Sequence, residues 1–159
     1  MSKKIIVGAD GSGFKLKEAV KKHLEIRGYE VVDIGTQDIN NPSHYFDVGF
    51  NVGKEVSDGS FERGIIFCGS GMGVGITANK IPGVYAAVCD NIYEAQQARI
   101  INNANILALG GNFVTPEIGI IMVDTFLDTE FAEGLPTETK EYLTKCLEEI
   151  DKKEEELYK

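Results

Sequence analysis

The sequence predicts an α/β protein in which helices cover both faces of a five-stranded parallel sheet. Short apolar runs alternate with longer amphipathic segments, which is typical of parallel sheets whose crossovers are helices. The run from Gly64 to Cys68 is wholly apolar, as expected of a strand that is buried on both faces. Polar or glycine-rich turns separate these segments. We therefore expect a Rossmann-like three-layer α/β/α sandwich with an extra C-terminal helix.

Local signals set the expected bounds of each element. Strands are expected over residues 4–9, 30–34, 64–68, 84–89 and 105–109. Helices are expected over residues 14–27, 45–57, 76–79, 92–102, 116–126 and 137–159. Gly28 closes the first helix, whereas Asn91 and Thr115 are suited to cap the N-termini of the fourth and fifth helices. Pro116 fits the first turn of the fifth helix.

The chain is expected to form one domain over residues 1–136, followed by a charged helix over 137–159 that belongs to the same domain. A narrow apolar stripe runs along this helix, formed by Leu143, Leu147, Ile150 and Leu157. So narrow a stripe suits a helix that packs on a surface rather than inside a core. That surface belongs either to a partner subunit or to the same domain, and the sequence leaves both open.

The composition limits the class of protein. A chain of 159 residues with a hydrophobic content of 43% can bury a sizeable core. Its formal net charge of −9 argues against nucleic acid and anionic membranes as partners. The three cysteines have no C-x-x-C spacing, so they suit a reducing cytosol and give no metal framework. The first residues show no signal-peptide pattern, and we expect a cytoplasmic protein without a metal or organic cofactor.

The candidate site is centred on Cys68, where the buried strand turns into a helix. Glycines follow it at alternate positions, namely Gly69, Gly71, Gly73 and Gly75. Because the turn has so little side-chain bulk, its backbone N–H groups can converge on an anion, and the positive end of the helix dipole favours a thiolate. Cys68 is therefore a candidate base or nucleophile. The alternative is a buried and inert cysteine in a tight turn.

The glycine-rich turns do not fit the familiar nucleotide motifs. A dinucleotide pattern would need glycine where the chain has Val74 or Ile76, and a phosphate loop would need glycine at Asn79. The first turn also fails, because Leu16 replaces its last glycine. A nucleotide cofactor is therefore not expected.

Two motifs give the chain a resemblance to a known family. Residues 68–75 read Cys-Gly-Ser-Gly-Met-Gly-Val-Gly, and residues 78–83 read Ala-Asn-Lys-Ile-Pro-Gly. Together they resemble the family of ribose-5-phosphate isomerase B and the galactose-6-phosphate isomerases. Further stretches agree with the family in type and order, and they lie at residues 8–10, 28–36, 103–110 and 121–126.

The resemblance implies an isomerase that interconverts aldose and ketose phosphates through an enediolate. Cys68 would move the proton between adjacent carbons, Ser70 would hydrogen-bond the sugar, and Asp10 would bind and orient a sugar hydroxyl. The enediolate oxygen would be held by the N–H groups of Gly69, Gly71, Met72 and Gly73, since preorganised donors matter most where negative charge develops.

The resemblance implies further substrate-binding positions and a shared site. Gly11 follows Asp10 at the end of the first strand. Apart from the resemblance, His44 in the loop before the second helix is placed to approach the strand ends, and it is either a substrate-binding residue or a plain loop residue. Asn102 matches an asparagine that reaches the site from the neighbouring subunit. The family therefore implies a homodimer or a dimer of dimers with shared active sites and a small sugar phosphate as substrate.

The sequence departs from the family at the ring-opening and phosphate-binding positions. Gly11 and Ile101 stand where the family has histidines. Asn112, Leu135 and Thr139 stand where arginines that grip the phosphate are expected. A substrate that is open-chain in solution, such as a four-carbon sugar phosphate, would need no ring-opening histidine.

Two rival interpretations remain beside a self-sufficient isomerase. In the first, the chain is one subunit of a mixed complex of the galactose-6-phosphate type, and the partner supplies the missing histidine and arginines. In the second, it is a non-catalytic protein that binds a sugar phosphate. The first predicts rescue by a partner chain, and the second predicts binding without proton exchange.

Overall fold

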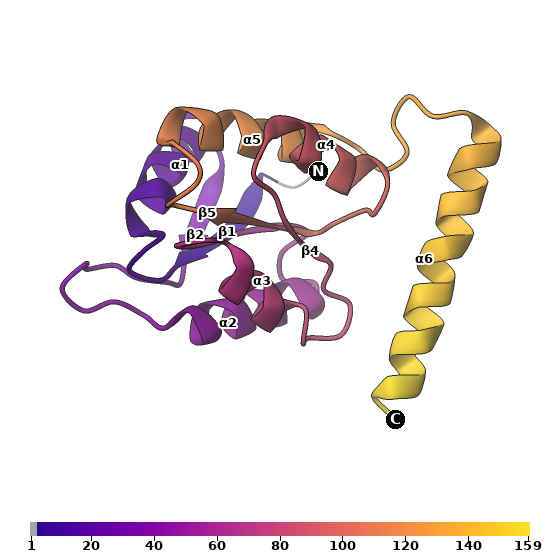
Figure 1. Cartoon of the computed structure of the whole chain (residues 1–159), viewed down its shortest axis with the longest axis horizontal. Coiled ribbons are helices and arrows are strands. Elements are labelled where there is room, and N and C mark those ends of the chain that lie inside the picture. Colours follow the sequence, from indigo (N-terminus) through magenta and orange to yellow (C-terminus); the bar gives the residue numbers. More distant parts are fainter. Residues whose placement is uncertain (1–2) are drawn as a thin grey trace.

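A computed structural model of the chain describes residues 3–159 and shows a three-layer α/β/α sandwich (Figure 1). Residues 1 and 2 of the predicted domain over 1–136 lie outside the described part. The strands are β1 (Lys4–Ala9), β2 (Glu30–Asp33), β3 (Gly64–Cys68), β4 (Ala86–Val88) and β5 (Ile106–Gly110). The helices are α1 (Phe14–Ile26), α2 (Tyr45–Ser57), α3 (Met72–Ala78), α4 (Ile92–Ile100), α5 (Pro116–Asp128) and α6 (Thr137–Leu157). The predicted fold class is confirmed.

The sheet is parallel, with the strand order β2-β1-β3-β5-β4. The chain adds β2 on one side of β1 and β3 on the other side, so the strand order reverses between β1 and β3. Ala9 pairs with Phe67, and Cys68 pairs with Gly110, so the carboxyl ends of the three central strands meet at one edge. Ligands of such sheets bind beyond this edge, near the point where the strand order reverses. The fold therefore places the residues after β1, β3 and β5 around one location.

Helices cover the two faces of the sheet unequally. Figure 1 shows α1, α4 and α5 on one face and α2 with α3 on the other. Each layer has its own apolar core, and β3 contributes to both because its side chains alternate. Ile65 and Phe67 belong to the core under α1 and α5, whereas Ile66 and Cys68 belong to the core under α2 and α3.

The third helix begins earlier than the sequence predicted. It runs from Met72 to Ala78, so that Gly73 and Gly75 lie inside it rather than in the preceding turn. Tertiary packing explains the difference. A Cβ on Gly73 would lie 2.7 Å from Cδ2 of Tyr45, and one on Gly75 would lie 2.8 Å from Cγ2 of Val88. Both glycines thus serve close helix packing, while Gly69 and Gly71 form the turn.

The fourth strand is shorter than the predicted range of 84–89. The Val84 N–H donates to the Ile81 carbonyl in a turn, and the Tyr85 N–H donates to the Asn105 side chain at 2.8 Å. These two residues therefore remain outside the ladder, which begins at Ala86. The remaining bounds agree with the predictions to within two residues.

The last helix stands beside the sandwich rather than on it (Figure 1). None of the residues of α6 is buried. It contacts the domain through polar groups, because Glu154 accepts from the Gly83 N–H at 2.7 Å and the Tyr158 hydroxyl donates to the Lys80 carbonyl at 3.0 Å. Tyr85 also donates its hydroxyl hydrogen to Asp151. Of its apolar stripe, Leu143 and Leu147 are partly exposed, and Ile150 and Leu157 are exposed.

Within residues 3–159, no helix combines the length and apolar character that crossing a membrane would require.

Candidate active site

The candidate site is built around the turn that follows β3. Cys68 is 5% exposed and ends the strand, while Ser70 is partly exposed in the turn. The Gly71 N–H donates to Sγ of Cys68 at 3.1 Å, and the Met72 N–H donates to Oγ of Ser70 at 3.2 Å. These contacts fix the sulfur at the mouth of the turn and place the Ser70 hydroxyl at the start of α3.

This turn requires glycine at position 71. Gly71 has φ of +79°, in the left-handed region that residues with a Cβ disfavour. The backbone also leaves no space there, since a Cβ would lie 3.1 Å from the Leu109 carbonyl carbon. The N–H that contacts the thiol is therefore held by a conformation that glycine alone adopts without strain.

Asp10 lies next to Cys68 at the end of the neighbouring strand. Its N–H donates to the Phe67 carbonyl at 3.2 Å, and its Oδ1 accepts from the Gly13 N–H at 2.9 Å. Gly13 packs so closely on β3 that a Cβ would lie 2.5 Å from the Phe67 carbonyl carbon. Oδ2 of Asp10 has no hydrogen-bond partner within residues 3–159, so this oxygen is available at the edge of the sheet.

The loop after β5 closes the other side of the turn. The Gly111 N–H donates to the Cys68 carbonyl at 2.8 Å, and the Asn112 N–H donates to the Gly69 carbonyl at 2.9 Å. A Cβ on Gly69 would lie 3.0 Å from Nδ2 of Asn112 and 3.4 Å from Cβ of Ser12. Ser12 and Asn112 therefore flank the residue that directly follows the thiol.

His44 lies at the N-terminal cap of α2 and is exposed. Its ring stacks on Phe46 with a centroid separation of 5.0 Å, and it makes no hydrogen bond to any described residue. The neighbouring Tyr45 packs on Gly73, and Pro42 of the same loop packs on Gly11. His44 thus borders the turn through its neighbours, and the structure does not join its ring to Cys68.

Asn102 lies away from the other predicted site residues. It precedes β5, whereas Cys68 pairs with Gly110 at the far end of that strand. A five-residue strand spans about 16 Å, so Asn102 does not reach the thiol of its own chain. Instead it lines a hollow beside β4, together with Asn79 and Tyr85.

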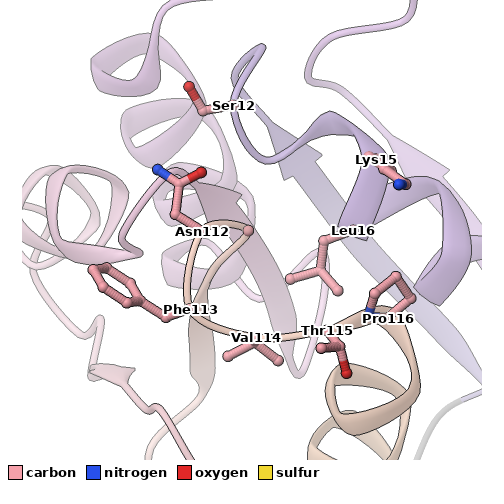
Figure 2. Close-up of a pocket in the computed structure, with 9 residues that line it drawn as sticks. Ser12, Lys15, Leu16, Asn112, Phe113, Val114, Thr115 and Pro116 are labelled. Carbon is pink, nitrogen blue, oxygen red and sulfur yellow. The ribbon is translucent and has the colours of Figure 1, made fainter.

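A pocket opens beside the turn, between the start of α1 and the loop that leads into α5 (Figure 2). Its volume is about 270 Å³. We call it the Lys15 pocket, and its lining consists of Ser12, Lys15, Leu16, Gly111, Asn112, Phe113, Val114, Thr115 and Pro116. In Figure 2 the Asn112 amide points toward Ser12, and Lys15 lies on α1 across the pocket. Sequence reasoning missed Lys15, although its place directly after the first strand and turn is a signal that could have found it.

The buried arginines serve the scaffold rather than a ligand. Arg99 is 4% exposed, and it donates to the carbonyls of Thr129 and Ala104. Burial, followed by the charge of Arg63, lowers the pKa of Arg99 to about 10. Arg63 itself donates to the carbonyls of Phe126 and Leu127. Arg99 thus ties α4 to the segment after α5 through backbone carbonyls.

The described side chains do not include a set of metal ligands. Within residues 3–159, histidine, cysteine and carboxylate side chains form no group of three or more that could hold an ion. What the site does assemble is a thiol, a carboxylate, a hydroxyl and backbone N–H donors. Such a set can move a proton next to a carbonyl and hold the negative charge that develops on its oxygen.

Sugar isomerases are among the known proteins whose sequences match this chain. Residues 5–144 match the family described as ribose/galactose isomerase. A 4-deoxy-4-sulfo-D-erythrose isomerase from a Clostridium species is 42% identical over 156 residues, covering 98% of each chain. A D-erythrulose-4-phosphate isomerase from Pectobacterium atrosepticum is 37% identical over 130 residues, covering 82% of this chain and 86% of the relative.

Solved structures agree with the sequence comparison. Ribose-5-phosphate isomerase B from Clostridium thermocellum superposes with a TM-score of 0.88 at 40% identity and covers 97% of this chain and 99% of its own. The Mycoplasma genitalium enzyme with bound ribulose-5-phosphate superposes with a TM-score of 0.86 at 34% identity and covers 96% of this chain and 97% of its own. The chain therefore belongs to the ribose/galactose isomerase family and is an aldose–ketose isomerase.

Proposed function

We propose that the chain interconverts the aldose and ketose forms of a four-carbon sugar that carries an anionic group on its last carbon, with Cys68 as the base. The contact between the Gly71 N–H and Sγ of Cys68, at 3.1 Å, carries the proposal. It holds a nearly buried sulfur at the edge of the sheet where substrates bind.

The proposed chemistry is a single proton transfer between adjacent carbons. The Cys68 thiolate takes the proton from the carbon beside the carbonyl, and the electron pair moves to the carbonyl oxygen to give an enediolate. The thiol then returns the proton to the former carbonyl carbon, while the hydroxyl proton moves between the two oxygens. N–H groups of residues 69–73 would stabilise the enediolate, and the free oxygen of Asp10 would orient the hydroxyl.

The size of the sugar follows from the residues that are absent. Gly11 and Ile101 leave no histidine at the positions where the family opens a sugar ring, and the ring of His44 stacks on Phe46. A four-carbon sugar with a substituted last carbon has no hydroxyl left to close a stable ring. Two relatives named above act on four-carbon sugars, which supports the same choice for this chain.

We further propose a homodimer or a dimer of dimers with shared active sites. Three observations support it. Asn102 lies beside β4, about a strand length from the thiol of its own chain. No residue of α6 is buried, and its apolar stripe is partly or fully exposed. Large apolar side chains are also exposed near the candidate site, namely Met72, Ile76, Val88, Tyr93 and Phe113. A second copy would cover them and bring its Asn102 to the site.

The cytoplasm is the proposed compartment. Cys68, Cys89 and Cys146 are free thiols, which a reducing environment preserves. The helix over 137–159 is proposed to be part of the same domain as residues 1–136, tied to it by the polar contacts of Glu154 and Tyr158.

Solvent deuterium exchange tests the chemistry directly. The purified protein is incubated in D₂O with the 4-phosphate and the 4-deoxy-4-sulfo form of erythrose and erythrulose, and label is followed by NMR. We expect label on the carbons next to the carbonyl, lost in Cys68→Ala and retained in Cys146→Ala, which removes a thiol on α6 instead. A folded protein that exchanges none of these sugars would contradict a self-sufficient isomerase.

A further inference from the structure

The charge of the Lys15 pocket is unusual for a family that handles phosphates. Lys15 is its only charged lining residue, and the other polar side chains there belong to Ser12, Asn112 and Thr115. Lys15 is exposed and forms no ion pair with any described residue. Asn112 occupies a position where the resemblance calls for a phosphate-binding arginine. The pocket therefore offers one positive charge and neutral hydrogen-bond donors.

The pocket lies beside the turn that follows Cys68. Ser12 and Asn112 both approach Gly69, the residue after Cys68, and Figure 2 shows Lys15 across the pocket from Asn112. A sugar whose carbonyl lies at Cys68 can thus extend its chain past Ser12 and Asn112 into this pocket. The terminal group of a short sugar would then meet the flexible ammonium of Lys15.

Electrostatics favours a terminal group with one negative charge. A phosphate monoester carries about −1.5 to −2 charges at pH 7, whereas a sulfonate carries one. Two cations or a bidentate arginine normally balance a phosphate. Here Lys15 is the single cation among the described residues that line the pocket, and the carboxylate of Asp10 lies at the carboxyl edge of the same sheet. A dianion would keep an unbalanced charge on leaving water, which is costly.

We propose that Lys15 binds the terminal anion of the substrate and that its single charge makes the pocket selective for a sulfonate over a phosphate. This inference rests on the proposed function, because it places the sugar carbonyl at Cys68. It assigns the selectivity to a residue of α1, outside the turn that performs the chemistry.

Steady-state kinetics on matched substrates tests the proposal. We compare 4-deoxy-4-sulfo-D-erythrose, D-erythrose 4-phosphate and uncharged D-erythrose with the wild-type protein, Lys15→Met and Lys22→Met. Lys22 lies on the same helix and is also exposed, so it controls for the loss of one charge. We expect Lys15→Met to raise KM for the sulfonate about tenfold with little change in kcat, and to leave kcat/KM for D-erythrose unchanged.

The wild-type protein is expected to prefer the sulfonate to the phosphate in kcat/KM, and Asn112→Arg to shift that preference toward the phosphate. A wild-type preference for the phosphate would overturn the selectivity. Equal effects of Lys15→Met and Lys22→Met would overturn the assignment to Lys15.

Binding separates this inference from the proposed function. Calorimetry with 4-deoxy-4-sulfo-D-erythritol, which has no carbonyl to react, measures the pocket alone. Weaker binding to Lys15→Met than to Lys22→Met would support Lys15 even if no sugar exchanged label. Equal binding to both variants would overturn the role of Lys15 even if Cys68-dependent exchange were observed.

Discussion

Gly49 of α2 and Thr77 of α3 approach each other so closely that a Cβ on Gly49 would lie 1.9 Å from Oγ1 of Thr77. The same Cβ would lie 2.6 Å from the Val74 carbonyl oxygen. This contact sets the distance between the two helices that cover one face of the sheet. Because α3 begins directly after Gly71, whose N–H contacts the thiol, the packing of Gly49 also holds the candidate site in place.

Gly49→Ala should therefore destabilise the protein. We expect the free energy of unfolding to fall by about 3 kcal/mol, because backbone as well as side chain must move. Gly53→Ala on the same helix is the matched control, since its closest contact would be Cγ1 of Ile81 at 3.1 Å. That variant should change stability by less than about 1 kcal/mol. Urea unfolding measures both, and equal losses would show that the Gly49 contact is unimportant.

Lys17→Met should destabilise the protein, because it removes the buried ammonium that pairs with the Asp33 carboxylate. Nζ of Lys17 lies 2.6 Å from Oδ2 of Asp33 and 2.6 Å from the Thr36 carbonyl oxygen, and the lysine is fully buried. Without it, the carboxylate keeps Lys21 at 3.3 Å and the Gly35 N–H. We expect a loss of about 3 kcal/mol in urea unfolding.

The control for that variant is Lys21→Met, whose side chain is partly exposed. It should cost about 1 kcal/mol or less. A smaller loss for Lys17→Met than for Lys21→Met would mean that the buried pair does not stabilise the fold.

Mixing two inactive variants tests the shared site. Cys68→Ala and Asn102→Ala should each lose most isomerase activity, one through the base and the other through the partner's contribution. When they are unfolded together and refolded at equal ratio, half of the dimers are mixed and each has one intact site. We expect about one quarter of wild-type activity. Activity no higher than the sum of the separate variants would contradict a site built from two chains.

The buried Cys89 should make stability depend on alkaline pH. Burial, with smaller effects of Glu94 and Asp90, raises the pKa of the Cys89 thiol from 9.0 to about 12. The unfolded chain loses this proton near pH 9 and the folded chain keeps it, so stability falls as pH rises from 9 toward 12. At pH 10 the loss is about 1 kcal/mol. Urea unfolding of Cys89→Ala should lack this contribution, and an identical pH slope in both proteins would contradict it.

The sequence predicted most of the fold because its signals are local. The apolar run of β3 and the caps at Asn91 and Thr115 appear in the structure as expected, with side-chain hydrogen bonds from both caps. The start of α3 was missed because glycine has low helix propensity, and only the packing of Gly73 on Tyr45 explains its place in a helix. The burial of Lys17 was missed for a similar reason, since its partner Asp33 lies in another element.

The candidate site was likewise predicted only in part from the sequence. Asp10 and Cys68 could be placed together because the carboxyl ends of parallel strands share an edge, and the structure does bring them there. The place of Lys15 after the first strand and turn could be read from the sequence, but the pocket that it lines could not. Its two sides come from residues 12–16 and 111–116, and only the finished sheet joins them.

The alternation of β3 between two cores ties the chemistry to the completeness of folding. Phe67 anchors the strand in one helical layer and Cys68 anchors it in the other. Opening either layer frees one side of the strand and exposes the sulfur, so a partly folded chain lacks the ordered candidate site. Newly made protein would then carry a vulnerable thiol until both layers close, and oxidative damage to Cys68 should fall mainly on unfinished molecules.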